Sequence, residues 1–315
     1  MAKIIEVTNL VKRYKKAEVN AVDNISFTIN EGEFFSLLGP NGAGKTTTIS
    51  ILTTTLSKTS GEVRIANYDL DKNQKQVRSS IGIIFQNPSL DVNLTAEENV
   101  RFHAILYGIY NFAPTFGLMN RDYQKKVYEL SEVLDIKKDI FKPIKTFSGG
   151  MKRKLEIVRS LIHKPKILFL DEPTSGLDPL SRKNLWQYLN NVRKSEKTTI
   201  FLTTHYLEEA EDADQVCIIN KGKIVSTGAP TKIKKELIKQ YLLLDSKRRN
   251  QLVKELEKLK LKFEKDDLIK IDLKNESPQK IISSIKTPLS YINIHNPTLE
   301  DAYLEIVDHQ NHNHA

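Results

Sequence analysis

One short stretch, Gly39-Pro-Asn-Gly-Ala-Gly-Lys-Thr46, constrains the fold of this chain more than any other feature. It fits the pattern G-x-x-x-x-G-K-[ST], whose glycines let a loop backbone wrap closely around phosphate groups. The apolar run 33–38 precedes it, and residues 45–52 continue with apolar side chains at helical spacing. A strand, a glycine loop and a helix in this order direct the unpaired N–H groups of the helix toward an anion. The sequence therefore predicts a phosphate-binding α/β domain rather than a glycine-rich turn without a ligand.

Residues from two parts of the chain are expected to act on the phosphates. Lys45 should reach the β- and γ-phosphates of a nucleotide, and the Thr46 hydroxyl should ligand Mg²⁺. Asp171 and Glu172 follow the apolar run 167–170, so they lie at the carboxyl end of a strand, where ligands of α/β sheets bind. Asp171 is placed to hold magnesium through water. Glu172 points to the opposite side of the strand and is the candidate to orient or deprotonate the attacking water.

A third element, Ser148-Gly-Gly150, precedes a helical pattern at 151–158, and its glycines free another helix N-terminus to meet an anion. With the phosphate loop and the two acids in this order, the chain resembles the nucleotide-binding subunits of ABC transporters over roughly residues 1 to 230. The resemblance implies ATP and Mg²⁺ as cofactors. The residues that match the family's Walker A loop are Gly39, Pro40, Asn41, Gly42, Ala43, Gly44, Lys45, Thr46 and Thr47.

The resemblance also assigns roles to residues outside the loop. Tyr14 matches the aromatic residue that stacks on adenine, and Asp171 and Glu172 match Walker B and the catalytic glutamate. Gln86 matches the Q-loop glutamine, which approaches magnesium and the nucleophilic water and links to a helical subdomain. His205 matches the switch histidine, which contacts the γ-phosphate.

Two further matches concern contacts between subunits. Ser148, Gly149 and Gly150 match the signature sequence, which in the family binds the γ-phosphate held by the other subunit. The segment Ser175-Gly-Leu-Asp178 matches the D-loop, which adds Asp178 to the expected nucleotide site. Because the phosphate loop and the signature lie far apart in the chain, each site is expected to be built from both chains of a homodimer. ATP is expected to close this dimer, and hydrolysis to reopen it.

The signature departs from the family's commonest form at two positions. Met151 stands in place of glutamine, and Phe147 in place of leucine. A thioether does not supply the hydrogen bonds of an amide, so the glycine backbone and Ser148 remain to bind phosphate. This form resembles the ATPase subunits of drug-resistance and ABC-2-type exporters, and so does the segment Pro297-Thr-Leu-Glu-Asp-Ala-Tyr-Leu304.

The resemblance implies an exporter ATPase that is cytoplasmic and bound to the inner face of the cell membrane through an ABC-2-type transmembrane permease subunit. Two alternatives stay open: an importer ATPase of the same architecture, and a soluble ABC ATPase that acts on ribosomes or nucleic acid. A phosphotransferase is disfavoured, because it would not need the Ser-Gly-Gly element. The aromatics that form either the socket for the permease or the core of the helical subdomain are Phe102, Tyr107, Tyr110 and Phe112.

Composition narrows the remaining possibilities. The chain has 315 residues, of which 39% are hydrophobic and 28% charged, and it lacks a run of about 18 uncharged apolar residues, so a soluble fold is expected. No secretory signal is expected, because Glu6 interrupts the first apolar residues. Cys217 is expected to be a buried strand residue. The net charge of +9 fits an anionic partner, but basic and acidic residues are mixed, and no nucleic acid partner is expected.

The predicted fold class is α/β, a P-loop NTPase domain of the ABC ATPase type with a small α+β domain after it. Residues 1–230 are expected to form the nucleotide-binding domain, with antiparallel strands over 3–28, a helical subdomain at about 87–165 and a mostly parallel sheet. Residues 231–315 are expected to form the accessory domain. In it we predict a Lys-rich helical segment to about Lys260, strands at 269–273 and 291–294, and helices at 278–285 and 298–307, the last with a Thr298/Asp301 capping box and a frayed tail at His309–His314.

Overall fold

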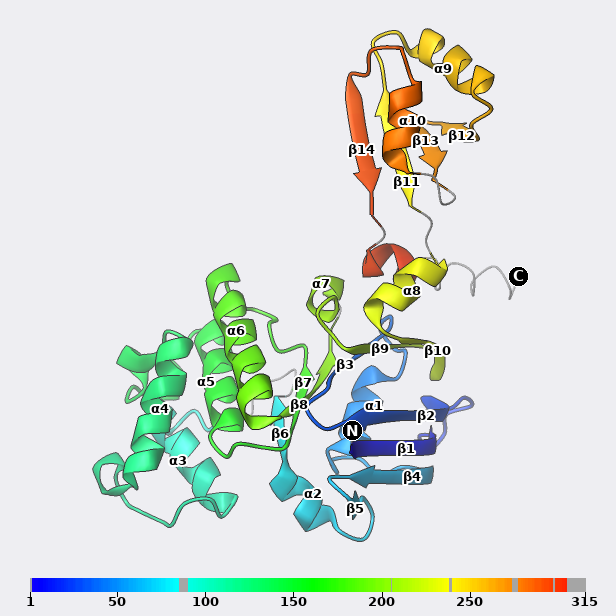
Figure 1. Cartoon of the computed structure of the whole chain (residues 1–315). Helices are drawn as coiled ribbons and strands as arrows, with labels where there is room; N and C mark the ends of the chain where they lie inside the picture. Colours follow the sequence, from blue (N-terminus) through cyan, green and yellow to red (C-terminus); the bar gives the residue numbers. More distant parts are fainter. Residues whose placement is uncertain are drawn as a thin grey trace. The chain divides into compact units, whose positions relative to one another are not determined.

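The computed structural model describes residues 2–84, 90–204, 206–237, 240–273, 277–296 and 298–304. The chain divides into two compact units, Met1–Ala229 and Pro230–Ala315. In the first unit, Figure 1 shows two sheets, with a group of helices beside the larger one. No helix among the described residues is both long and apolar enough to cross a membrane.

The first sheet of this unit is antiparallel, as predicted. It contains β1 (Lys3–Lys12), β2 (Val22–Asn30), β4 (Ser60–Ile65) and β5 (Tyr68–Asp69), in the order β2-β1-β4-β5. Side chains of β2 alternate between buried and exposed because one face of the sheet packs on the core.

The central sheet carries the functional loops. Its order is β10-β9-β3-β8-β7-β6, and all its neighbouring strands are parallel except β10, which is antiparallel to β9. Every residue of β3, β7 and β8 is buried, as expected for parallel strands covered on both faces. The strands are β3 (Phe34–Leu38), β6 (Ile81–Ile84), β7 (Ile167–Asp171), β8 (Thr199–Thr203), β9 (Gln215–Asn220) and β10 (Lys223–Gly228).

Helices connect and flank these strands. Helix α1 (Lys45–Leu52) follows β3, and α6 (Pro179–Glu196) lies between β7 and β8 as predicted. The predicted helical subdomain contains α3 (Ala96–Leu106), α4 (Arg121–Val133) and α5 (Gly149–Leu161), which lie together on the left of Figure 1. Thr95 and Glu98 form a capping box at the start of α3. The unit also contains two short α-helices, α2 (Gln74–Ser80) and α7 (Leu207–Ala210).

The second unit begins with α8 (Pro230–Leu237) and continues as a split β-α-β-β-α-β arrangement. Its antiparallel sheet has the order β12-β13-β11-β14. Residues 299–304 are helical, and the predicted capping box is present, because Thr298 and Asp301 exchange side-chain to backbone hydrogen bonds of 2.8 and 3.1 Å. The other elements are β11 (Tyr241–Asp245), α9 (Arg249–Lys258), β12 (Phe263–Lys265), β13 (Ile269–Asp272), α10 (Pro278–Ser284) and β14 (Tyr291–His295).

The predicted helical segment up to Lys260 is wrong in its middle. Strand β11 interrupts it and is the strand on which β13 and β14 both pair. Leu242 and Leu244 are buried while their neighbours along the strand are half-buried, which is the period of a strand. Pairing on both sides decides the conformation here, because it outweighs the weak helical preference of a leucine run.

Candidate functional site

The phosphate loop packs against neighbouring backbone with no room for side chains at two glycines. A Cβ at Gly39 would overlap the carbonyl oxygen of Ile219 on β9. Gly44 has φ +107°, a left-handed conformation, and a Cβ there would overlap the carbonyl oxygen of Ala21. Both glycines are therefore required by the path of the loop, as the sequence pattern predicts.

The start of α1 has the properties of an anion site. Gly44 is its N-cap, no side chain caps it, and no acid lies in its first turn. Lys45 is 8% exposed, and its Nζ donates hydrogen bonds to the carbonyl oxygens of Gly39 at 2.6 Å and Pro40 at 3.1 Å. Burial lowers the pKa of Lys45, and the charges of Asp171 and Glu172 oppose this shift. A buried cation beside a helix N-terminus that no side chain caps fits a phosphate ligand.

Tyr14 lies beside this loop. Its hydroxyl is 3.3 Å from Oγ1 of Thr47, and Nζ of Lys12 lies 5.4 Å from the centre of its ring. The side chain is 45% exposed, so part of it is open to solvent at the loop. The predicted adenine-stacking residue and the predicted phosphate loop are thus neighbours in the fold.

Asp171 is the last residue of β7 and is buried. Burial raises its pKa, while a 2.5 Å hydrogen bond from Oγ1 of Thr203 and the charges of Arg153 and Lys45 act in the opposite direction. The structure therefore brings Lys45 and the two predicted acids into one electrostatic group, at the edge where β3, β7 and β8 end. Carboxylate oxygen is the kind of ligand that Mg²⁺ prefers, and the exposed Thr46 adds a hydroxyl at the loop.

Glu172 has an uncommon backbone. Its φ is +50°, in the left-handed region that residues other than glycine rarely adopt. Its N–H donates to the carbonyl oxygen of Thr203 at 2.9 Å, and its own carbonyl accepts from the N–H of Ser175 at 3.2 Å. Such a conformation is costly for a residue with a side chain, and surrounding contacts hold it here.

One of these contacts comes from a residue that the motifs do not indicate. Arg153, on α5, donates hydrogen bonds to the carbonyl oxygens of Asp171 at 2.9 Å, Glu172 at 2.6 Å and Pro173 at 3.1 Å. In the sequence it is one basic residue among several in the stretch Met151-Lys-Arg-Lys154. Only burial, which is invisible without the fold, distinguishes it from its neighbours.

The signature residues lie at the start of α5. Ser148 is the N-cap, and its hydroxyl accepts a 3.2 Å hydrogen bond from the N–H of Met151. Ser148 and Gly149 are exposed, and no acid lies in the first turn of α5. Among the hydrogen bonds described for this chain, none joins Ser148, Gly149 or Gly150 to the phosphate loop. The fold thus presents a second helix N-terminus that faces solvent and suits an anion.

Asp178 has a structural role at the start of α6. It is the N-cap of α6, where its carboxylate accepts hydrogen bonds from the N–H and the hydroxyl of Ser181 at 2.9 and 2.5 Å. These bonds lower its pKa to about 2. Its Oδ2 lies 3.7 Å from Nζ of Lys154 on α5. Asp178 therefore stays ionised and connects the start of α6 with α5.

Two predicted site residues, Gln86 and His205, lie outside the described residues, as do Pro297 and the histidines of the tail. Of the aromatics assigned to a socket or a core, Tyr107 stacks on His163 with ring centres 5.0 Å apart. Tyr110 packs edge-to-face on Tyr123 at 5.3 Å. Both serve the interior of the helical subdomain, whereas Phe112 is 68% exposed.

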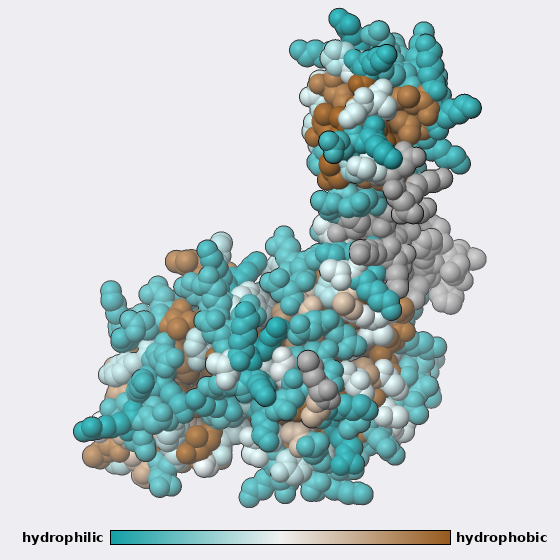
Figure 2. Space-filling model, in the orientation of Figure 1, coloured by the Kyte–Doolittle hydropathy of each residue, from teal (hydrophilic) through white to brown (hydrophobic). Residues whose placement is uncertain are grey.

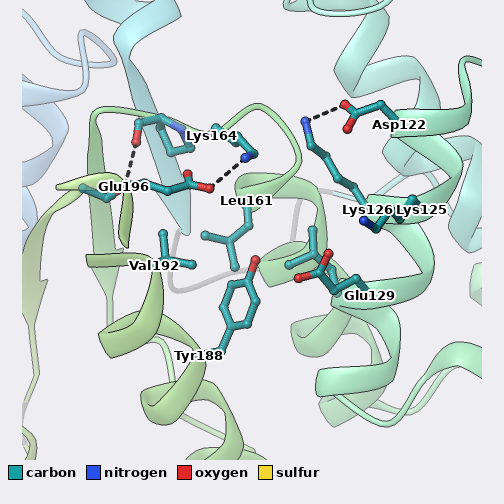
Figure 3. Close-up of a pocket in the computed structure, with 12 residues that line it drawn as sticks. Asp122, Lys125, Lys126, Glu129, Leu161, Lys164, Tyr188, Val192 and Glu196 are labelled. Atoms are coloured by element: carbon teal, nitrogen blue, oxygen red, sulfur yellow. Dashed lines mark hydrogen bonds and ion pairs between the residues drawn. The ribbon is translucent and has the colours of Figure 1, made fainter. Parts of the chain in front are cut away.

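A cavity of about 170 Å³ lies elsewhere, among α4, α5, α6 and the residues before β8. Two ion pairs lie in its lining, Lys126 with Asp122 at 2.8 Å and Lys164 with Glu196 at 2.7 Å (Figure 3). None of the nucleotide-site residues predicted from the sequence lines it. The chemistry predicted from the motifs therefore does not use this cavity.

The chain is similar to known ATP-binding proteins. The sequence profile described as "ABC transporter" matches residues 22–175. The probable multidrug ABC transporter ATP-binding protein YbhF of Escherichia coli (strain K12) is 36% identical over 73% of this chain and 38% of its own length. The linearmycin resistance ATP-binding protein LnrL of Bacillus subtilis (strain 168) is 36% identical over 72% of this chain and 70% of its own length.

A solved structure extends the similarity to the fold. The dimeric ATP-binding cassette MJ0796, in a post-hydrolysis state bound to ADP and Pi, matches with a TM-score of 0.65 at 28% identity, over 72% of this chain and 98% of that one. Coverage differs among the relatives, since the match spans 38% of YbhF but 70% of LnrL.

Proposed function

This chain belongs to the ABC transporter family of ATP-binding proteins, and from that premise we propose that it is the ATP-hydrolysing subunit of an exporter. It works as a homodimer whose two ATP sites are each completed by the partner chain. Its membrane partner is an ABC-2-type permease, which holds it on the inner face of the cell membrane.

One observation carries the dimer proposal: the chain presents the two halves of an anion site on separate elements. The phosphate loop with Lys45 forms one half, and the exposed N-terminus of α5 at Ser148 forms the other. Each half is a helix N-terminus, whose N–H groups attract phosphate, and a nucleotide bound between two copies contacts both. An isologous two-fold dimer then contains two equivalent sites.

The residues divide the chemistry among them. Tyr14 stacks on adenine, Lys45 holds the β- and γ-phosphates, and Thr46 and Asp171 hold magnesium. The metal ion supplies positive charge that neutralises the phosphate oxygens. Glu172 accepts the proton of the attacking water, a role that requires an ionised carboxylate within hydrogen-bond reach of that water. Gln86 and His205 complete the site by their match to the family's motifs.

The names of two relatives favour export over import as the direction of transport. YbhF is named a multidrug transporter protein and LnrL a resistance protein, and both match residues that include the Phe147 to Met151 signature region of this chain. The helical subdomain offers a surface for the permease, because Leu106, Phe112 and Leu118 are 84, 68 and 69% exposed. Figure 2 shows hydrophobic groups at the surface of this region, at the lower left. Contiguous exposed apolar patches mark protein interaction sites, and we propose that these side chains contribute to one.

Affinity co-purification tests the proposal. The Glu172→Gln variant is isolated with Mg-ATP from detergent-solubilised native cells, and its partners are identified by mass spectrometry. A polytopic membrane protein at a ratio near 1:1 is the expected result. Ribosomal proteins or nucleic acid without a membrane protein would overturn the exporter assignment, and a permease accompanied by a solute-binding protein would indicate import instead.

A further inference from the structure

We propose that Arg153 is a positioning residue for ATP hydrolysis: it fixes the backbone at Asp171, Glu172 and Pro173 so that the Glu172 carboxylate is held where the attacking water binds. This inference rests on the proposed function, since it concerns the same hydrolytic site. It assigns a role to a side chain that lies outside the predicted nucleotide contacts.

The contact geometry is specific to a guanidinium group. Nε of Arg153 donates to Pro173, and Nη2 donates to both Asp171 and Glu172, at 2.6 to 3.1 Å. Three consecutive carbonyl oxygens are thus held by one planar group. The fixed fork of arginine matches such an array, whereas the ammonium group of lysine is a single point charge.

The Arg153 side chain is itself held in place by burial and by an ion pair. Its side chain is 4% exposed, and its Nη1 lies 3.4 Å from Oε2 of Glu156, which is also buried. Glu156 in turn lies 3.4 Å from Nη2 of Arg159. A buried charge is tolerated only when it is paired and hydrogen-bonded, and Arg153 meets both conditions. The position of the Arg153 side chain is therefore set by its contacts within the protein, including Glu156 on α5, and not by contact with solvent.

The held segment is the one that needs support. Glu172 has φ +50°, and its N–H is already bound to Thr203 on β8. Thr203 fixes the segment from the sheet side, and Arg153 fixes it from the helix side. Without the arginine, the carbonyl groups of Asp171, Glu172 and Pro173 each lose one donor, and the left-handed residue loses its anchor on the helix side. A displacement of about 1 Å at a catalytic group lowers turnover by about 10²-fold.

The helix that carries Arg153 is also the helix that begins at Ser148. Two functional elements of the chain are thus joined by one rigid segment, namely the signature N-terminus and the catalytic strand end. Arg153 is the side chain that makes this connection through hydrogen bonds with charge assistance, which are the stronger kind.

The test compares Arg153→Lys with Arg101→Lys in the full chain. Arg101 is a matched control, because it too is buried and bonded to a glutamate, Glu97, and to a carbonyl, that of Ala113, but it lies in the helical subdomain away from Glu172. We expect Arg153→Lys to lower kcat by about 10- to 100-fold while KM for ATP stays within about threefold. Arg101→Lys should leave kcat within about twofold of wild type when both are assayed well below their unfolding temperatures.

A double variant separates positioning from a general loss of structure. In the Glu172→Gln background, adding Arg153→Lys should lower hydrolysis by less than about twofold, because no carboxylate remains to be positioned. Arg153→Gln serves as a second variant if the lysine form does not fold, since its neutral amide leaves no unpaired buried charge. A kcat within about twofold of wild type for a folded Arg153 variant would overturn the inference while leaving the proposed function intact. Absence of hydrolysis by the wild-type chain and its permease complex would instead overturn the proposed function.

Discussion

Replacing Glu172 with glutamine separates the chemical role of this side chain from its structural role. Three hydrogen bonds at this residue use its backbone: its N–H donates to Thr203, and its carbonyl accepts from Arg153 and Ser175. Glutamine has nearly the same size and shape, so these bonds and the left-handed conformation remain. The amide, however, does not accept a proton at neutral pH. The loss is therefore expected in turnover and not in the fold.

The size of the effect follows from the task assigned to the carboxylate. A positioned general base contributes about 10²- to 10⁴-fold to rate, so kcat should fall by about 10²-fold or more. This corresponds to at least about 2.7 kcal/mol of transition-state stabilisation. The affinity for ATP should stay within about threefold or increase, because a negative charge near the phosphates is removed.

The assay measures phosphate release at saturating Mg-ATP together with nucleotide binding by fluorescence. Glu208→Gln is the control, since it makes the same charge change on the exposed side of α7. It should leave turnover unchanged. If the Glu172→Gln variant binds ATP and still hydrolyses it within about threefold of the wild-type rate, Glu172 is not the base.

Three further predictions address the loop and the helical subdomain. Gly39→Ala should abolish ATP binding, measured by calorimetry, because its Cβ would overlap the carbonyl oxygen of Ile219; unchanged affinity would refute the tight packing of the loop. Arg101→Met should lower the free energy of unfolding in urea by about 3–5 kcal/mol, because it leaves the Glu97 carboxylate buried without its cation; a loss below about 1 kcal/mol would contradict this. Burial lowers the pKa of His103 to about 3, so the unfolded chain binds this proton more readily and stability falls as pH drops below 6.5. Between pH 7.5 and 5.5, protonation of His103 in the unfolded chain should lower the free energy of unfolding by about 1.4 kcal/mol. If the His103→Gln variant loses the same stability between these pH values, His103 is not the cause.

Local patterns were sufficient to predict the central part of the fold. The strands β3, β7 and β8 are continuous apolar runs, and such runs bounded by turns are typical of parallel strands buried on both faces. The glycines of the phosphate loop predict its conformation directly, because close backbone approach at Gly39 and the left-handed φ at Gly44 both require glycine. The antiparallel sheet and the Thr298/Asp301 capping box followed equally from alternation and capping chemistry.

Long-range pairing decided what the sequence patterns did not predict. Strand β11 contains a leucine run that reads as helix until its partners β13 and β14 are known. Arg153 shares its surroundings in the sequence with other basic residues, and only the folded chain shows that it reaches three carbonyl groups of the catalytic segment. Both cases depend on residues that are distant in the chain, which local periodicity does not detect.

The central claim is that each ATP site requires the signature residues of a second chain. The direct measurement is the molar mass of the Glu172→Gln variant by sedimentation with and without Mg-ATP, compared with the same variant carrying Ser148→Asp. Aspartate is as good an N-cap as serine, so α5 is retained while a negative charge faces the partner's phosphate. We predict a dimer with Mg-ATP for Glu172→Gln alone and a monomer for the double variant, with ATP bound in both. A monomer in the first case, or a dimer in the second, would contradict the shared site.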